Sequence, residues 1–212
     1  GIENNPKMFA LAASNMILRG DGKANLHQGS CFDDAITASV KNMKPNVGLI
    51  NPPYAQSKSD AELHELYFVK HMLDQLQEGG IGVAIIPIPC VTAPSQAKHD
   101  ILASHTLKAV MSVPNELFYP VGVVTCIVVF EAHKAHEESK KKTWFGYWKD
   151  DGFEKTKHLG RVNLNNRWEN IKNYWVETYR NNEVHPGFSV TQYVTADDEW
   201  VAEAYLETDY SN

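Results

Sequence analysis

Two patterns of apolar residues alternate along most of the chain. Stretches in which apolar residues recur every three or four positions predict helices over residues 6–19, 60–77, 96–104 and 168–180. Between them stand short, nearly continuous apolar runs, which are typical of strands buried in a sheet. These runs occupy residues 1–3, 24–28, 47–50, 81–87, 107–112, 126–131 and 143–148. Strands that alternate with helices predict an α/β fold with a doubly wound, mostly parallel sheet.

One of these runs ends in an unusual tetrapeptide, Asn51-Pro52-Pro53-Tyr54. Neither proline has an N–H to donate, so the strand cannot continue past Ile50. Asn51 and Tyr54 are therefore expected at the carboxyl end of a strand, where open α/β sheets bind ligands. The side-chain oxygen of Asn51 and the carbonyl of Pro52 can accept both hydrogens of an exocyclic amine, and Tyr54 offers a flat face to a base. These four residues are the candidate catalytic residues.

Asn-Pro-Pro-Tyr after a strand resembles the catalytic motif of amino-methyltransferases that act on the N6 amine of adenine. Related Asn-Pro-Pro motifs serve RNA and protein-glutamine methyltransferases, and the tetrapeptide could also be a simple strand-terminating turn. Residues 16–23 and 27–32 are similar to the modification subunits of type I restriction-modification systems. The closing residues 200–211 resemble the end of the same family's methyltransferase domain. The resemblance implies a class I fold that uses S-adenosylmethionine to methylate adenine N6 in DNA.

The cofactor-binding candidates that this resemblance implies are Glu3, Ser30, Cys31 and Phe32, together with Asn51. Glu3 closes a strand just before a helix, where doubly wound folds bind a ribose, although a solvated turn carboxylate is the alternative. Ser30 and Phe32 would border the adenine of the cofactor. The family usually carries Asp where this chain has Ser30. Serine can still accept a hydrogen bond, but it is shorter and uncharged, and Asp33 would be a weak substitute.

A second aromatic candidate follows the strand at 107–112. Residues 114–125 resemble the family's target-base loop, in which a phenylalanine stacks against the adenine extruded from the duplex, and Phe118 is the match. A base inside a helix must be flipped before its edge can react, and an aromatic sandwich compensates for the lost stacking. The resemblance thus implies that Tyr54 and Phe118 enclose the base. Taken alone, Phe118 would be a core aromatic.

Composition limits how the chain could meet DNA. The formal net charge is −6, whereas a stand-alone DNA-binding module is usually basic. Either a local positive surface or partner subunits must therefore supply the phosphate contacts. Lys140, Lys141 and Lys142 could touch phosphates, but the charged stretch 134–142 fits a solvated hairpin connection.

The remaining sequence features argue against metal and membrane sites. Three widely separated cysteines fit core thiols in a reducing cytoplasm. His64 and His71 lie seven residues apart with no third ligand, so no metal site is expected. No apolar run approaches the roughly 18 residues of a membrane span, and no signal peptide opens the chain. A cytoplasmic protein that does not bind membranes is expected.

The glycine-rich cofactor turn of the family is not found before Glu3. We therefore expect a fragment that lacks the central first strand, with a partial methyltransferase core at 1–148 and a C-terminal extension at 149–212. Such a fragment would bind S-adenosylmethionine weakly, be inactive alone, and could self-associate through unpaired strand edges. Duplex DNA and the specificity and restriction subunits are the implied partners. The alternatives are an RNA or protein-glutamine methyltransferase and a non-catalytic assembly or DNA-binding subunit.

Overall fold

The computed structural model of the protein describes residues 1–22, 25–54 and 64–207. The polar loop expected over 55–59, the start of the helix at Asp60 and the closing residues after 207 lie outside these ranges, as does Ala24. The chain divides into two compact units, residues 1–45 and residues 46–212. Each unit is described by itself.

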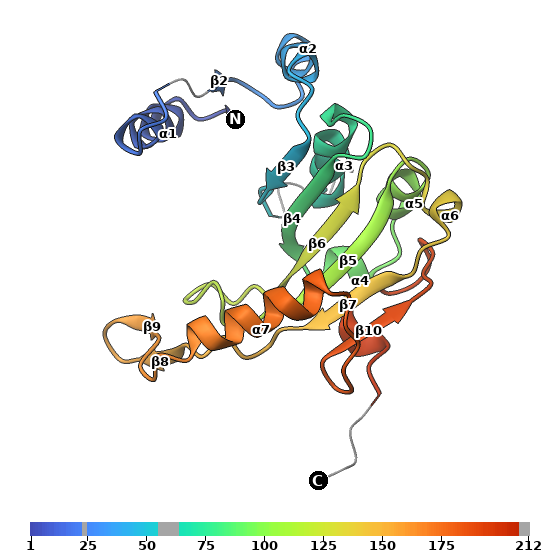
Figure 1. Ribbon diagram of the computed structural model, residues 1–212. Helices are drawn as coiled ribbons and strands as arrows, with labels where there is room; N and C mark the ends of the chain where they lie inside the picture. The colour runs from blue at the N-terminus through green and yellow to red at the C-terminus, as the bar shows by residue number, and fades with distance from the viewer. Residues whose placement is uncertain (23–24, 55–63, 208–212) are drawn as a thin grey trace. The chain divides into compact units, whose positions relative to one another are not determined.

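The first unit pairs two short parallel strands with two helices. Strand β1 (Ile2–Glu3) lies beside β2 (His27–Gln28), and helix α1 (Pro6–Leu18) connects them (Figure 1). The side-chain oxygen of Asn5 accepts hydrogen bonds from the N–H groups of Lys7 and Met8, which fixes the start of α1. This strand–helix–strand order was predicted and is confirmed.

Helix α2 (Asp34–Asn42) completes the first unit and was not predicted. Asp33 is its N-cap, because one carboxylate oxygen accepts from the N–H groups of Ala35 and Ile36, each at 3.0 Å. The carboxylate considered as a substitute cofactor contact thus has a structural role in starting this helix.

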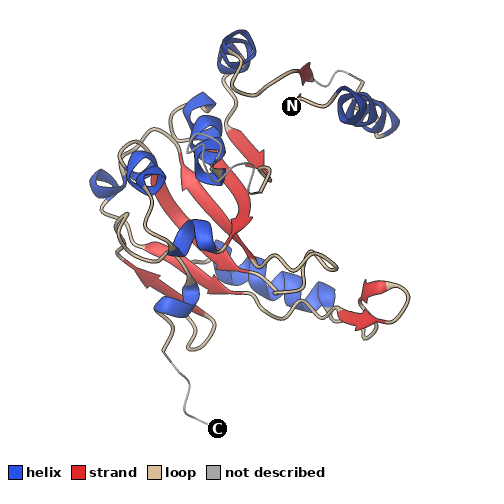
Figure 2. Ribbon diagram, turned by 180° about the vertical axis from the view of Figure 1, so that it is seen from behind, coloured by secondary structure: helices blue, strands red, loops and turns tan. Residues whose placement is uncertain are grey.

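The second unit contains a six-stranded mixed sheet in the order β10-β7-β5-β6-β4-β3 (Figure 2). Strands β3, β4, β5 and β7 share one direction, as predicted, while β6 and β10 run against them, so that three of the five neighbouring strand pairs are antiparallel. The strands are β3 (Val47–Ile50), β4 (Ile81–Pro87), β5 (Thr106–Ser112), β6 (Thr125–Glu131), β7 (Thr143–Tyr147) and β10 (Ser189–Gln192).

Helices cover both faces of this sheet (Figures 1 and 2). On one face pack α3 (Glu65–Gln75), α4 (Pro89–Thr92) and α5 (Gln96–Leu102), together with Trp200, which precedes the short 3-10 helix η2 (Ala202–Ala204). On the other face lies α7 (Trp168–Arg180), whose Trp175 stacks on Trp148 with ring centroids 5.0 Å apart. The α/β class is therefore confirmed as a three-layer arrangement.

Two glycines allow α3 to approach the strands β3 and β4 closely. A Cβ at Gly48 would lie 2.7 Å from the sulfur of Met72, and a Cβ at Gly82 would lie 2.3 Å from a methyl carbon of Leu73. Both distances are too short for a real side chain. Because Gly48 and Gly82 are also partners in the β3–β4 register, the helix rests directly on backbone at this point.

Two expectations about the sheet are wrong. The run at 47–50 was expected to be a buried strand, but Val47 and Leu49 are 62% and 79% exposed. Strand β3 is the edge of its sheet, so only its inner face is covered by α3. The stretch 134–142 is not a hairpin connection. It contains α6 (His136–Ser139) and crosses over, because β7 pairs with β5 and not with β6.

The C-terminal part of the chain shares the core of the sheet. The indole of Trp200 is fully buried, makes an edge contact with Phe130 of β6 and donates its N–H to the carbonyl of Thr195 at 2.8 Å. The ammonium of Lys98 lies 4.7 Å from its ring centroid. Residues before and after position 148, the expected boundary between core and extension, therefore pack together. The division into these two parts stays a prediction.

The three cysteines are free thiols, as expected for core residues. Cys90 and Cys126 are buried free thiols, and Cys31 is half-buried. Among these residues, no helix combines the length and the apolar character needed to cross a membrane.

Replacing Trp200 with alanine should destabilise the protein by about 3–5 kcal/mol, because it empties a large, fully buried volume against β6. Urea unfolding followed by circular dichroism measures this. Tyr193→Ala is the matched control, since Tyr193 is 64% exposed and should cost much less. Equal losses for the two variants would show that Trp200 does not hold the C-terminal segment in the core.

Candidate functional site

The side chains of Asn51 and Tyr54 are joined at the end of β3. The hydroxyl of Tyr54 donates to the side-chain oxygen of Asn51 at 2.7 Å and lies 3.4 Å from the carbonyl of Ile85 in β4. Asn51 is exposed, whereas Pro52 is buried and Tyr54 half-buried. An amide oxygen has two lone pairs, so the one not used by Tyr54 can accept from a ligand. Tyr54 thus fixes the orientation of the Asn51 amide, a contact that the sequence did not predict.

The surroundings of the Tyr54 hydroxyl keep it protonated. Burial raises its pKa above the ordinary value, and the acidic groups of Cys126, Cys90 and Glu65 add to the shift. A phenol that keeps its proton remains a donor to Asn51 throughout the physiological pH range.

Beside the tyrosine lies a cluster formed by His64, Glu65 and Cys90, whose potential ligand atoms are all within 4.8 Å of one another. Burial, followed by the neighbouring Glu65 carboxylate, raises the pKa of Cys90 to about 12. In this structure the sulfur is therefore a protonated thiol that hydrogen-bonds to Glu65. The imidazole of His64 accepts from the N–H of Leu66 at 3.2 Å and caps α3. The absence of a metal site stays a prediction.

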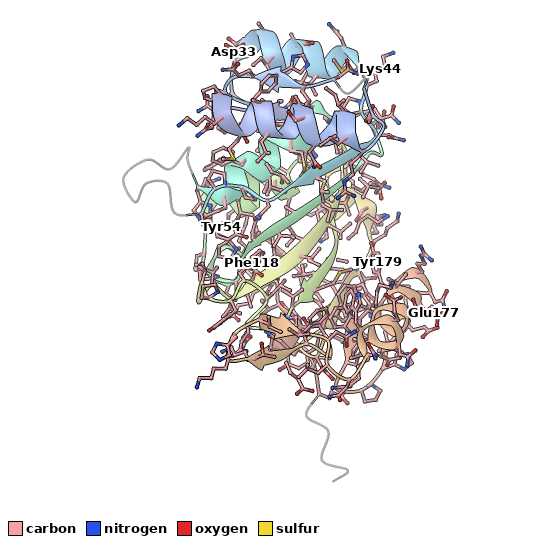
Figure 3. All side chains as sticks on the ribbon, turned by 90° about the vertical axis from the view of Figure 1, so that its left-hand side faces the viewer. Asp33, Lys44, Tyr54, Phe118, Glu177 and Tyr179 are labelled. Atoms are coloured by element: carbon pink, nitrogen blue, oxygen red, sulfur yellow. The ribbon has the colours of Figure 1, made fainter. Side chains whose placement is uncertain are left out.

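The loop that carries Phe118 begins at the carboxyl end of β5, which lies at the same end of the sheet as Asn51 after β3. It leaves β5 after Ser112 and returns at Thr125, which pairs with Pro87 at the carboxyl end of β4. Figure 3 shows Tyr54 and Phe118 on this side of the second unit. Phe118 is half-buried, and its carbonyl accepts from the N–H of Val121 at 2.8 Å within the loop. The fold thus brings the two aromatic candidates to one edge.

The cofactor candidates of the first unit also meet at one edge. Glu3 and the turn from Ser30 follow neighbouring parallel strands, and the N–H of Gly29 donates to the carbonyl of Glu3 at 3.1 Å. One carboxylate oxygen of Glu3 accepts from the N–H of Asn5, and the hydroxyl of Ser30 accepts from the N–H of Phe32. The ring of Phe32 is 40% exposed. Burial raises the pKa of the neighbouring Cys31 thiol.

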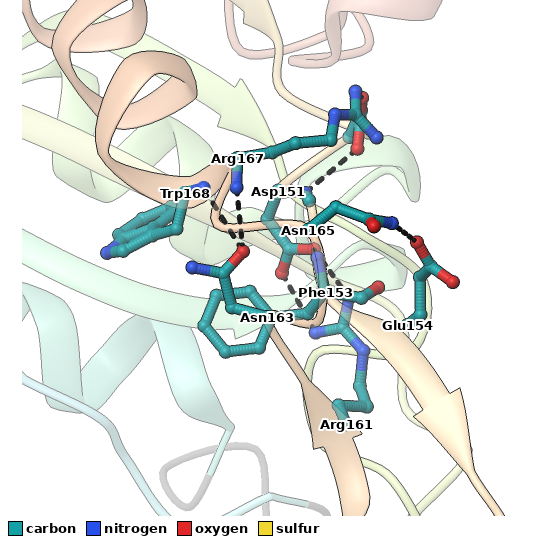
Figure 4. A network of polar contacts seen from close by, with 10 residues as sticks. Asp151, Phe153, Glu154, Arg161, Asn163, Asn165, Arg167 and Trp168 are labelled. Atoms are coloured by element: carbon teal, nitrogen blue, oxygen red, sulfur yellow. Dashed lines mark hydrogen bonds and ion pairs between the residues drawn. The ribbon is translucent and has the colours of Figure 1, made fainter.

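A polar network beside the Phe118 loop was not foreseen (Figure 4). Arg161 donates two hydrogen bonds to the buried carboxylate of Asp151, at 2.9 and 2.6 Å. This pair holds the base of a hairpin formed by β8 (Glu154–Thr156) and β9 (Gly160–Val162). The hairpin and the loop line a hollow of about 700 Å³. In the sequence, this hairpin is signalled only weakly, by two runs of three residues on either side of a turn that ends in glycine.

Comparison with known proteins identifies the family. Residues 1–205 match the family model described as N-6 DNA Methylase. The chain belongs to the N-6 DNA methylase family. The family predicted from Asn51-Pro52-Pro53-Tyr54 and from the similar segments elsewhere in the chain is thereby confirmed.

Relatives with sequence similarity or solved structures agree with this membership. The chain is 39% identical over 170 residues to the type II restriction enzyme and methyltransferase RM.BcgI of Heyndrickxia coagulans, covering 76% of this chain and 26% of that protein. It resembles the type I restriction-modification methyltransferase subunit of Streptococcus thermophilus with a TM-score of 0.72 and 17% identity, over 98% of this chain and 48% of that one.

A class I S-adenosylmethionine-dependent methyltransferase structure from Listeria monocytogenes matches with a TM-score of 0.60 and 13% identity, over 85% of this chain and 54% of that one. The fold is therefore that of the class I methyltransferases. The chain spans about a quarter of the length of RM.BcgI and about half of these structures. The roles of its individual site residues stay predictions.

The Tyr54 hydroxyl should ionise above pH 10, because burial raises its pKa above the ordinary value of 10.0 for tyrosine. Ultraviolet absorbance near the tyrosinate band can be followed against pH in the wild type and in Tyr54→Phe. The difference between the two curves isolates Tyr54. A difference curve with its midpoint at or below pH 10 would show that the hydroxyl is not buried against Asn51.

Proposed function

We propose that this chain is the catalytic part of a DNA methyltransferase that transfers a methyl group from S-adenosylmethionine to the N6 amine of adenine, as modification subunit of a restriction-modification system. The observation that carries the proposal is the Asn51 amide, which Tyr54 orients at the carboxyl edge of the sheet. Family membership supports the reaction class. Phe118, on the same edge, supports a flipped base as the substrate.

The groups at this edge suit an amine that needs orientation more than deprotonation. The second lone pair of Asn51 and the carbonyl of Pro52 accept the two N6 hydrogens. The nitrogen lone pair then points away from both acceptors and is available for attack on a methyl group. The amine would release one proton to solvent as it gains the methyl group. Tyr54 and Phe118 stack on the base and hold it in line.

The first unit fits the nucleoside end of the cofactor. Glu3 places a carboxylate at the end of β1, where it can accept from ribose hydroxyls. The exposed ring of Phe32 provides an apolar face for adenine, beside Ser30 and Cys31. When bound, S-adenosylmethionine would supply the methyl group from its sulfonium sulfur, which would keep the electron pair of the broken S–C bond and leave as a neutral thioether. Duplex DNA and the specificity and restriction subunits are the proposed partners.

Asn51→Ala should lower the rate of methyl transfer by about 100-fold or more in the complete protein, because it removes the acceptor that positions the nucleophile. Affinity for S-adenosylmethionine should change much less. Radiolabelled methyl transfer to duplex DNA and calorimetry measure the two quantities side by side. Asn170→Ala, at an exposed position of α7, is the matched control. Near-normal transfer by Asn51→Ala would refute the role given to Asn51.

Phe118→Ala should weaken binding to DNA with a flipped adenine by about 1–3 kcal/mol, the contribution of one aromatic stacking partner. Phe118→Trp should have a smaller effect, since it keeps a stacking face. A fluorescent adenine analogue at the methylation site reports the flipping. If the wild type and Phe118→Ala give equal signals, Phe118 is a packing residue and not a base contact.

A further inference from the structure

The hairpin of β8 and β9 is a basic segment on an acidic chain. Residues 154–167 contain four cationic side chains and one carboxylate, whereas the whole chain has a formal net charge of −6. The cations are Lys155, Lys157, Arg161 and Arg167, and the carboxylate is Glu154. The hairpin projects from the N-terminal end of α7 (Figure 1). It is therefore a candidate for the local positive surface that DNA binding requires.

Three of the four cations are engaged in holding the hairpin in place. Arg161 binds the buried Asp151 through two hydrogen bonds, and Arg167 pairs with Asp150. Lys155 pairs with Glu116. Lys155 and Arg161 are directly opposite in the strand register, where like charges repel, so these carboxylates also remove a source of instability.

The tip of the hairpin, residues 157–159, presents different chemistry. Lys157 and His158 are exposed, and Lys157 forms no ion pair within the described part of the chain. Leu159 is 76% exposed. DNA-binding proteins use cations to bind backbone phosphates and apolar side chains to insert between base steps, and the tip carries one of each.

Hydrogen bonds fix the conformation of the tip, although the tip is exposed. The hydroxyl of Thr156 accepts from the N–H of Leu159 and donates to the carbonyl of Gly160, both at 3.0 Å. Asn165 donates to Glu154 at 2.6 Å across the base of the hairpin. An isolated two-stranded hairpin is marginal in water, so these contacts are what orders it.

The same hairpin is tied to the loop that carries Phe118. The ammonium of Lys155 lies 4.9 Å from the ring centroid of Tyr119 in that loop, in addition to its ion pair with Glu116. Leu159 lines the 700 Å³ hollow together with Leu117 and Tyr119. The hairpin tip is therefore held at a fixed place relative to the residue that would stack on the extruded base.

We propose that the tip of the β8–β9 hairpin contacts the DNA duplex next to the target adenine. Lys157 binds a backbone phosphate, and Leu159 packs against the base pairs at the step from which the adenine leaves. The inference rests on the proposed function and adds a DNA contact to it. Duplex DNA is favoured over a protein partner because the tip combines an unpaired cation with continuity to a base-binding loop.

Lys157→Ala in the complete protein, with its partner subunits, tests the phosphate contact. Its affinity for duplex DNA should fall several-fold on any sequence. The slope of log affinity against log salt concentration should become shallower by about 0.9, the value for one lost phosphate contact. Lys108→Ala is the control, because its side chain is 36% exposed and it lies near the amino end of β5, the end of the sheet opposite Asn51. It should leave the slope unchanged.

Leu159→Ala tests the wedge. Fluorescence of an adenine analogue at the methylation site, measured at saturating DNA, should lose much of the flipping signal. Leu164→Ala is the matched control, since Leu164 is also exposed, at 56%, but lies beyond β9 and outside the tip. It should keep the signal.

The outcomes separate this inference from the proposed function. If Asn51→Ala abolishes methyl transfer but both tip variants match their controls in salt slope and flipping, the hairpin inference is overturned and the function stands. If the tip variants bind DNA normally but lose a partner subunit in gel filtration, the tip is a protein interface and the inference also fails. If the wild-type complex neither binds nor methylates DNA, both proposals fall.

Discussion

The close approach of α3 to the backbone of β3 and β4 is the constraint on which the candidate site depends. A Cβ at Gly48 or Gly82 would overlap the side chain of Met72 or Leu73, so that side chain would have to move to keep the helix at this distance. At the other end of α3, its N-cap His64 and its first residue Glu65 lie beside Cys90 near Tyr54. Packing between elements thus decides the environment of the tyrosine that orients Asn51.

Strands and loops contribute different groups to the candidate site. The paired strands place Asn51 at a fixed depth, since Ile50 is in register with Ala84 and the two prolines end the strand there. Loops then supply the aromatic faces, Tyr54 from one and Phe118 from another. A nucleophile that is activated by orientation alone gains most from such fixed acceptors, because small errors of placement cost large factors in rate.

Local chemistry explains what the sequence could predict and what it could not. Strands β3 and β4 and helix α7 were placed at their observed bounds, because prolines, glycines and helical periodicity are encoded within a few residues. The exposure of Val47 and Leu49 depends instead on which strands lie alongside β3. The crossing from β6 to β7 depends on pairing across the sheet. The hairpin has strands of three residues each, too short for any periodicity to show.

The same distinction applies to charge. A net charge of −6 describes the whole chain, but at physiological ionic strength a charge acts over a Debye length of about 8 Å. Carboxylates far from the hairpin are screened from a phosphate at its tip. Near the hairpin, Asp151, Asp150 and Glu116 are paired with Arg161, Arg167 and Lys155, and Glu154 accepts from the amide of Asn165 at the base of the hairpin. The charge nearest to a phosphate at the tip would therefore be that of Lys157. A protein with a negative net charge can thus present a local cationic contact.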